Sequence, residues 1–194
     1  MKEYIQSALK QGIDLRRICL EDSGLISNIA AAVKNIVQAL KQGGKICLFG
    51  NGGSAADAQH IAAELVGRLR LERNGLRAIA LTTNTSTVTA LANDYGYEHI
   101  FTRQLEAVGV SGDVAFGIST SGSSANVLNG LLLAKKLGMT TVGLTGKAPN
   151  KISEACDIAL AIPSSDTQRI QELHIAVGHI ICELTEQSLF SQVR

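Results

Sequence analysis

The sequence predicts a three-layer α/β/α fold, in which helices cover both faces of a parallel sheet of about five strands. Two observations predict this fold. Short apolar runs with the length of buried strands alternate with longer helical runs from residue 45 onward, and polar or glycine-rich turns follow several of these runs. Parallel strands need long crossover connections, which the intervening helices supply. The runs expected to form strands are Lys45–Gly50, Ala78–Thr83, Val114–Ser119, Thr141–Thr145 and Ile158–Ile162.

Two helices are expected before the first strand. Tyr4–Leu20 has apolar residues at helical spacing, and residues 25–40 carry an apolar stripe of helical period that ends at Gly43 and Gly44. A compact sheet domain does not need two such helices. We therefore expect residues 1–44 to form a helical extension that packs between subunits, an expectation that a monomer in sedimentation would contradict.

The other predicted helices alternate with the strands or follow the last one. The clearest of these runs are Ser54–Arg70, Ser123–Leu137 and Thr167–Leu189. No internal repeat, low-complexity tract or linker interrupts the chain, so we expect residues 1–194 to form a single domain. Ligands of a fold of this kind are expected at the carboxyl ends of its strands.

Composition and charge argue against several kinds of partner. Lys and Arg number 18 against 17 Asp and Glu, a formal net charge of +1, so no strong attraction to nucleic acid or membrane is implied. The absence of Trp and an aromatic fraction of 4% argue against a base-stacking surface. Four scattered cysteines, no signal-like apolar core at the N-terminus and no apolar run of membrane-spanning length indicate a cytoplasmic protein with reduced thiols.

A glycine-rich loop, Gly50–Ser54, joins the first predicted strand to a helix. Its glycines permit positive φ and a close approach to a ligand, and Ser54 is a favourable N-cap. The free N–H groups at the start of the helix make an anion site such as one for phosphate. An ordinary turn that binds nothing is the alternative, and no Gly-Lys-Ser/Thr sequence follows as in a Walker loop.

His60 and Glu64 lie four residues apart on the helix that follows this loop. On an α-helix such residues are roughly 40° apart and share one face. The pair suits a metal ion or proton transfer. A solvated surface pair is the alternative.

A second polar stretch, Ser119–Asn126, follows the third predicted strand and is rich in hydroxyl groups. Its hydroxyls and the start of the next helix suit a neutral phosphate cradle, although such turns also serve as helix caps. Asn93 and Asp94 are residue types typical of a turn. They could equally form hydrogen bonds to a polyol.

The last predicted helix carries Gln171, His174 and His179. Gln171 and His179 are roughly 80° apart around the helix, whereas the two histidines are about 140° apart. The second angle disfavours a single site for both histidines. The spacing does not decide which of them is functional, and a histidine in the core or at an interface is the alternative for either.

Several motifs in this order resemble the sugar isomerase (SIS) domain family, and most closely its phosphoheptose isomerases. The resemblance covers nearly the whole chain, including the N-terminal helices, although Ser-Thr-Ser-Gly alone marks only the wider SIS class. The residues that carry it are Asn51–Ser54, Asp57-Ala58-x-His60, Asn93-Asp94, Gly112-Asp113-Val114, Ser119–Gly122, Leu144–Gly146 and Arg169-Ile170-Gln171-Glu172-x-His174.

The resemblance implies a flavodoxin-like SIS fold and a homotetramer with active sites between subunits and one zinc ion (Zn2+) per subunit. The implied metal ligands are His60, Glu64, Gln171 and His179. The implied substrate contacts are Asn51, Gly52, Gly53, Glu64, Asn93, Asp94, Ser119, Thr120, Ser121, Ser124 and Gln171. Glu64 and His179 fit the roles of catalytic acid–base residues, and His174 is then structural.

The implied reaction is the aldose–ketose isomerisation of sedoheptulose 7-phosphate to D-glycero-D-manno-heptopyranose 7-phosphate through an enediol, the entry to activated heptose for surface polysaccharide. One alternative is a non-catalytic SIS protein that binds the replication initiator DnaA, but such proteins lack the residues found here at Glu64 and His179. The other is a SIS isomerase for a different sugar phosphate. Where some members have an Asp this chain has Gln168, so Asp166, Thr167 and Gln168 are all candidates to contact the sugar.

Overall fold

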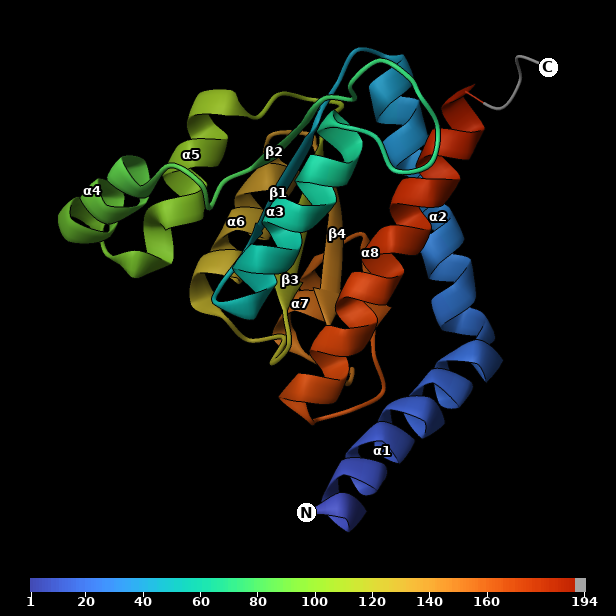
Figure 1. Cartoon of the computed structure of the whole chain (residues 1–194). Helices are drawn as coiled ribbons and strands as arrows, with labels where there is room; N and C mark the ends of the chain where they lie inside the picture. Colours follow the sequence, from blue (N-terminus) through green and yellow to red (C-terminus); the bar gives the residue numbers. More distant parts are fainter. Residues whose placement is uncertain (191–194) are drawn as a thin grey trace.

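A central sheet of five strands, all parallel, organises the structure (Figure 1). The computed structural model describes residues 1–190. The strand order is β2-β1-β3-β4-β5, which confirms the predicted class of fold. The strands are β1 (Ile46–Gly50), β2 (Ala78–Ala80), β3 (Val114–Ser119), β4 (Thr140–Thr145) and β5 (Ile158–Ala161).

Helices pack on both faces of this sheet (Figure 1). One face is covered by α2, α3 and α8, and the other by α5, α6 and α7. Across residues 1–190, no helix combines the length and apolar character needed to span a bilayer. The helices are α1 (Lys2–Glu21), α2 (Ser23–Lys41), α3 (Gly53–Val66), α4 (Thr85–Tyr95), α5 (Ile100–Val108), α6 (Ala125–Lys136), α7 (Lys151–Ala155) and α8 (Thr167–Phe190), with a 3-10 turn η1 (Tyr97–His99).

The central strands read as continuous apolar runs because both of their faces are buried. In β1, Ile46 and Leu48 join the core shared with α2, α3 and α8. Cys47 and Phe49 point to the other face, where the Phe49 ring lies 5.1 Å from that of Phe101 on α5. Alternate side chains of one strand thus hold two helical layers in place.

The strand order also marks where a ligand would bind. From β1 the chain crosses one way to β2 and then back past β1 to β3, so the direction of winding reverses between β1 and β3. In open α/β sheets the crevice outside the carboxyl ends of the strands at this switch point is the usual binding position. The Gly50–Ser54 loop follows β1 and the serine-rich stretch follows β3, so both border it.

Several local predictions were wrong in their boundaries. The helix expected to reach Arg70 ends at Val66, where Gly67 is the C-cap, and the strand expected to reach Thr83 ends at Ala80. Ser54 is not the N-cap of α3: Gly52 holds that position with φ 56°, a backbone conformation that favours glycine.

Asn93 and Asp94 were expected in a turn, but they lie within the last turn of α4. Asn84 is the N-cap of this helix, with a side chain that accepts a hydrogen bond from Thr87 N, and Gly96 is its C-cap. Gly96 has φ 91°, which a helix does not allow. The turn that the sequence suggested at residues 93–96 therefore begins only at this glycine.

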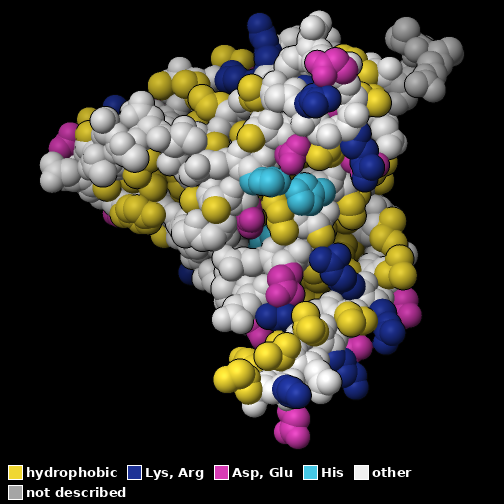
Figure 2. Space-filling model, in the orientation of Figure 1, with side chains coloured by type: hydrophobic (Ala, Val, Ile, Leu, Met, Phe, Trp, Pro, Cys, Tyr) yellow, Lys and Arg dark blue, Asp and Glu magenta, His cyan; other side chains and the backbone are white. Residues whose placement is uncertain are grey.

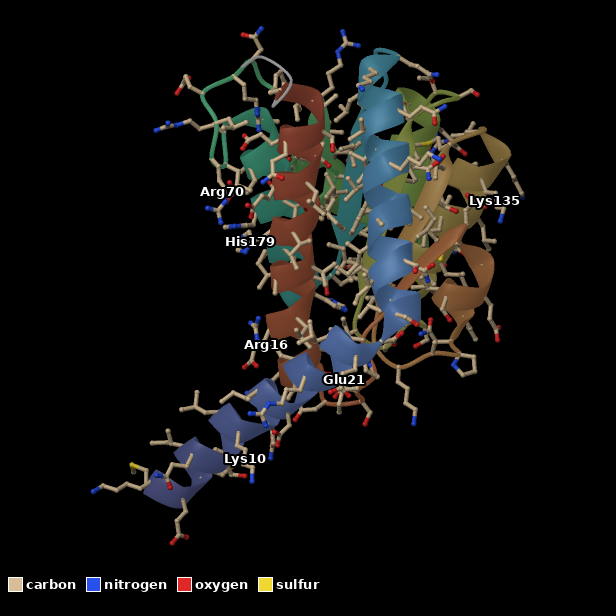
Figure 3. The ribbon with its side chains drawn as sticks, turned by 90° about the vertical axis from the view of Figure 1, so that its right-hand side faces the viewer. Lys10, Arg16, Glu21, Arg70, Lys135 and His179 are labelled. Carbon is tan, nitrogen blue, oxygen red and sulfur yellow. The ribbon has the colours of Figure 1, made fainter. Side chains whose placement is uncertain are left out.

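Helix α1 projects away from the rest of the molecule (Figures 1 and 3). Only Leu15 on this helix is buried, and Figure 2 shows apolar side chains gathered on its surface. Their exposure is high, at 77% for Tyr4 and 64% for Leu9. The helix therefore has an apolar face that its own chain leaves uncovered.

Candidate active site

Helices α3 and α8 lie side by side and run in the same direction. Along the pair, Gly53 lies next to Gln171, His60 next to His179, and Ile61 next to Cys182, whose Sγ is 3.9 Å from the Ile61 carbonyl oxygen. Gly178 allows this close approach, because a Cβ there would fall 2.7 Å from Ile61 Cδ1. Residues far apart in the sequence thus lie at corresponding positions along the two helix axes.

His60, Glu64 and His179 meet at the middle of this helix pair, and we call them the His/Glu/His cluster. His60 Nε2 is 2.9 Å from His179 Nε2 and 3.2 Å from Glu64 Oε1. The potential ligand atoms of all three lie within 4.8 Å of one another. Figure 2 shows histidine side chains adjacent to one another on this face, open to solvent.

The chemistry of this cluster fits a metal ion. His60 Nε2 can carry only one proton, yet it faces both a second imidazole nitrogen and a carboxylate oxygen. A divalent cation shared by the three groups would satisfy all of them at once. Two imidazoles and one carboxylate form a ligand set typical of zinc sites that keep an open position.

Asp57 stands one turn before His60, on the same face of α3 as His60 and Glu64. Its Oδ2 is buried and has no hydrogen-bond partner among the described residues. Burial raises the pKa of Asp57, and the nearby His60 opposes the rise. A carboxyl group with a free, buried oxygen therefore lies beside the cluster.

Two residues of other elements, Asn126 and Tyr97, are hydrogen-bonded to the glycine-rich loop. Asn51 and Asn126 exchange two amide hydrogen bonds, of 2.9 and 2.8 Å, and the Tyr97 hydroxyl donates to Asn51 Oδ1 at 3.0 Å. Gly53 lies directly against the Gln171 amide, so any side chain at position 53 would collide with it. Gly52 and Gly53 are nevertheless exposed, so a ligand can approach the backbone at the start of α3.

The hydroxyl groups that follow β3 converge on one another. Ser119 Oγ lies 2.9 Å from Ser124 Oγ and 3.3 Å from Ser121 Oγ, and Ser123 N donates to Ser121 Oγ at 3.3 Å. Gly122 turns the chain with φ 64°. The stretch therefore presents a group of short donors at the start of α6, as an anion site requires.

The structure separates some of the residues that the sequence grouped together. Gln171 and His179 are eight residues apart, about 12 Å along α8, so Gln171 lies at the glycine-rich loop and not in the cluster. Asn93 and Asp94 are exposed on α4, far from α8 in Figure 1, and Asn93 Nδ2 donates to Asp94 Oδ1 at 2.8 Å.

His174 lies in the core and outside the cluster. It is fully buried, and its Nε2 donates to the Thr145 carbonyl at 3.0 Å. Burial lowers the pKa of His174 to about 4, although the bond to Thr145 opposes the shift. His174 is therefore neutral near pH 7, and the structure brings only His179 to His60 and Glu64.

Known proteins share both the sequence and the fold. The SIS domain model matches residues 16–146, and phosphoheptose isomerase of Clostridium acetobutylicum is 48% identical over 99% of this chain and 98% of its own. This chain belongs to the phosphoheptose isomerase family. Solved members from Neisseria gonorrhoeae and Francisella tularensis are similar to it, with 40% and 35% identity and TM-scores of 0.90 and 0.91.

These two structures of phosphoheptose isomerases match over nearly their whole length. The chain covers 98% of the Neisseria protein and 97% of the Francisella protein, and 96% and 95% of this chain is covered in turn. The family resemblance inferred from the motifs is confirmed. It extends over the N-terminal helices as well as the sheet.

Sequence reasoning missed several residues that shape this site in a phosphoheptose isomerase family member. Asp57 had a usable signal, because it stands three residues before His60 in a motif already noticed. Asn126 ends the serine-rich stretch, but its pairing with Asn51 joins two separate loops. Tyr97 contacts Asn51 from the short η1 turn and Arg73 contacts the Glu64 carbonyl from an irregular segment, and neither segment has a sequence period that indicates a role.

Proposed function

We propose that this chain is a phosphoheptose isomerase that converts sedoheptulose 7-phosphate to D-glycero-D-manno-heptopyranose 7-phosphate, the first step of activated heptose biosynthesis. The observation that carries the proposal is the His/Glu/His cluster between α3 and α8, in a chain 48% identical to a phosphoheptose isomerase over almost its full length. The reaction moves one proton between C1 and C2 and another between O1 and O2 through an enediol.

The proposed metal is Zn2+, one per subunit, held by His60, Glu64 and His179. When bound, it would polarise the sugar oxygens between which the proton moves. Their ligand atoms lie within 4.8 Å of one another, which supports this set. Gln171 as a further ligand stays a prediction, and its position beside Gly53 favours a contact with the substrate.

Glu64 and His179 are the proposed acid–base residues. Both lie within 3.2 Å of the same nitrogen of His60, so one could serve the carbon-bound proton and the other the oxygen-bound proton of a single substrate. The Glu64 side chain is only 20% exposed, so substrate above it would exclude much of the remaining water. A proton removed there would be retained at the site and not lost to solvent.

The proposed phosphate site lies at the carboxyl edge of the sheet. Ser119, Thr120, Ser121 and Ser124 would hold the phosphate, with Asn51, Gly52 and Gly53 on the other side of the switch point. The convergence of the serine hydroxyls supports this assignment. Fixing the phosphate would bring C1 and C2 to the acid–base residues. Asn93, Asp94 and Gln171 are proposed to contact the sugar.

The proposed assembly is a homotetramer in the cytoplasm with active sites between subunits. Residues 1–44 would form its helical interface, which the uncovered apolar face of α1 supports. Contacts from a neighbouring subunit would then complete each site. Sedimentation of the full chain tests this part of the proposal, which a monomer would contradict.

Replacement of Glu64 by Gln tests the proposed function directly. Glu64→Gln should lower turnover of sedoheptulose 7-phosphate by about 1,000-fold while the size of the oligomer stays unchanged. Glu106→Gln is the matched control, since Glu106 is an exposed helical glutamate that pairs with Arg103 on its own helix. Metal analysis accompanies both assays, and near-normal turnover in Glu64→Gln would refute the catalytic assignment.

A panel of sugar phosphates separates the proposal from its alternatives. Faster turnover of a hexose phosphate would favour a different SIS isomerase. A metal-free and inactive wild-type oligomer that captured DnaA would favour the non-catalytic binding protein. The same panel is assayed before and after chelation of metal. The expected result is that heptose phosphate is turned over fastest, that this turnover is lost on chelation, and that it recovers on adding Zn2+.

A further inference from the structure

Arg73 lies in the irregular segment between α3 and β2, yet its side chain is only 2% exposed. The guanidinium group is surrounded by backbone carbonyls at the end of α3. Nη2 donates to the Glu64 carbonyl at 2.8 Å, and Nη1 donates to the carbonyls of Leu65 at 2.7 Å and Gly67 at 2.8 Å. A third acceptor of Nη1 is the Asn74 carbonyl at 3.1 Å.

Through these bonds the Arg73 side chain caps the last carbonyls of α3, in addition to the C-cap residue Gly67. The last four carbonyls of a helix have no partner within the helix, and the negative end of the helix dipole favours a cation there. Arg73 supplies donors and charge from beyond the end of the helix. Glu64 stands in the last turn of α3, so the cap holds the backbone of a cluster residue.

Glu186, near the end of α8, holds Arg73 in turn. Arg73 Nε donates to Glu186 Oε1 at 3.0 Å. The carboxylate also accepts hydrogen bonds from three successive backbone amides, those of Leu69 at 3.2 Å, Arg70 at 2.9 Å and Leu71 at 3.0 Å. Both charges of this buried pair therefore have hydrogen-bond partners on every side.

The hydrogen bonds keep Glu186 ionised despite its 1% exposure. Burial alone would raise the pKa of Glu186, but the backbone amides and Arg73 outweigh it and hold that pKa below its usual value. Removing either partner would leave the other charge buried and unpaired, which is strongly destabilising.

This ion pair connects the two helices that carry the cluster. Glu186 follows His179 by seven residues on α8, which places both on nearly the same face of the helix. In Figure 3, Arg70 and His179 lie on the same side of α8, and Arg70 Nε donates to Glu183 Oε1 at 3.0 Å. The segment that carries Arg73 thus lies along the helix beside the site.

We propose that Arg73 and Glu186 are positioning residues, which fix the position of Glu64 along α3 relative to that of His179 along α8. They touch neither metal nor substrate in this assignment. They act through the Glu64 backbone and the α8 helix, so they set the separation on which metal binding depends. The inference rests on the metal site of the proposed function and extends it beyond the ligands.

A second buried ion pair provides a matched control. Asp113 has no exposed side-chain surface, pairs with the Lys45 ammonium group, and accepts from the backbone amides of Lys45 at 2.9 Å and Val110 at 3.0 Å. It lies beside the first residues of β1 and β3, and these hydrogen-bond partners belong neither to α3 nor to α8. Loss of this pair should destabilise the chain without touching the site.

The experiment compares Arg73→Gln, Glu186→Gln and Asp113→Asn in the full chain with Co2+ as the metal probe. Affinity is measured by competition with a chelator, and coordination by the visible absorption of bound Co2+. All three variants should unfold at a lower temperature. Only the Arg73 and Glu186 variants should lose Co2+ affinity, by about tenfold or more, and change the visible spectrum.

Wild-type affinity and spectrum in the Arg73 and Glu186 variants would overturn the inference, as would an equal loss in Asp113→Asn. Should the glutamine variants fail to fold, Arg73→Lys decides, because it keeps the charge but cannot span the four carbonyls that Arg73 binds. A severalfold loss of affinity supports the inference, and none overturns it. A wild-type chain that bound no Co2+ would refute the proposed metal site as well.

Discussion

Helices α1 and α8 are the two longest in the structure, with 20 and 24 residues, but they use their apolar residues differently. Helix α8 packs against α2 and α3, and its face toward the sheet is buried. Helix α1 buries only Leu15 and leaves residues such as Leu9 and Ile13 exposed. The position of α8 is therefore fixed by its own chain, whereas the apolar face of α1 is left uncovered by the described residues.

The largest effect is expected at His179 on α8. His179→Gln should remove one proposed ligand and acid–base group, and lower turnover of heptose phosphate by about 1,000-fold together with the bound metal. Turnover and metal content of the same sample measure this. His99→Gln is the control, because His99 is an exposed histidine on η1. Equal activity in the two variants would contradict the role of His179.

A smaller effect is expected at His174, one of the buried residues of α8. Its pKa of about 4 in the fold lies below the ordinary 6.5, so it binds a proton more readily when unfolded. The stability it contributes is fully present above pH 6.5 and is lost as the pH falls toward 4, about 3 kcal/mol in all.

Urea unfolding between pH 7 and pH 4.5 measures this loss, with His174→Gln as the comparison. The amide of Gln can still donate to the Thr145 carbonyl but does not titrate in this range. The variant should show a flatter pH dependence of the free energy of unfolding. Identical slopes for variant and wild type would show that another group controls acid stability.

Gly53→Ala tests the contact between α3 and α8 at the glycine-rich loop. The added Cβ would collide with the Gln171 amide, and overpacking of this kind costs about 1–3 kcal/mol. We expect KM for the sugar phosphate to rise about tenfold, because the collision displaces proposed substrate contacts. Gly12→Ala on α1 is the control, since its Cβ would meet the ends of two flexible side chains, Glu172 at 3.1 Å and Arg169 at 3.6 Å.

The smallest effect on the single chain is expected on α1. Leu9 and Ile13 are 64% and 52% exposed, so replacing both by Lys should change the stability of the isolated fold by only about 0.5 kcal/mol. The oligomer should nevertheless dissociate, which sedimentation would detect as a lower mass. Retention of the wild-type mass would place the interface elsewhere.

The sequence predicted the central strands well because β1, β3 and β4 are buried on both faces. β3 was predicted at Val114–Ser119, as found, since its run is apolar throughout. The end of α3 was missed although Gly67, its C-cap, is a local stop signal, and the Arg73 side chain that binds its last carbonyls comes from outside the helix. The pattern of helical residues alone continued to Arg70.

The site was predictable as residue types but not as an arrangement. The pair His60 and Glu64 shares one helix, so its spacing was sufficient to place both on one face. The choice of His179 over His174 needed the family resemblance, because helical angles on α8 alone leave both possible. The position of Gln171 depends on α3 running parallel to α8, which a single sequence does not encode locally.

Cys182 lies one turn beyond His179, with its Sγ against the Ile61 carbonyl of α3. Burial raises the pKa of this thiol to about 12, with Glu64 reinforcing the rise, so it is protonated and covered while the two helices stay together. Only a local opening of the helix pair would let an alkylating reagent reach it. The rate of labelling at Cys182 therefore measures how often the active site comes apart in an otherwise folded molecule.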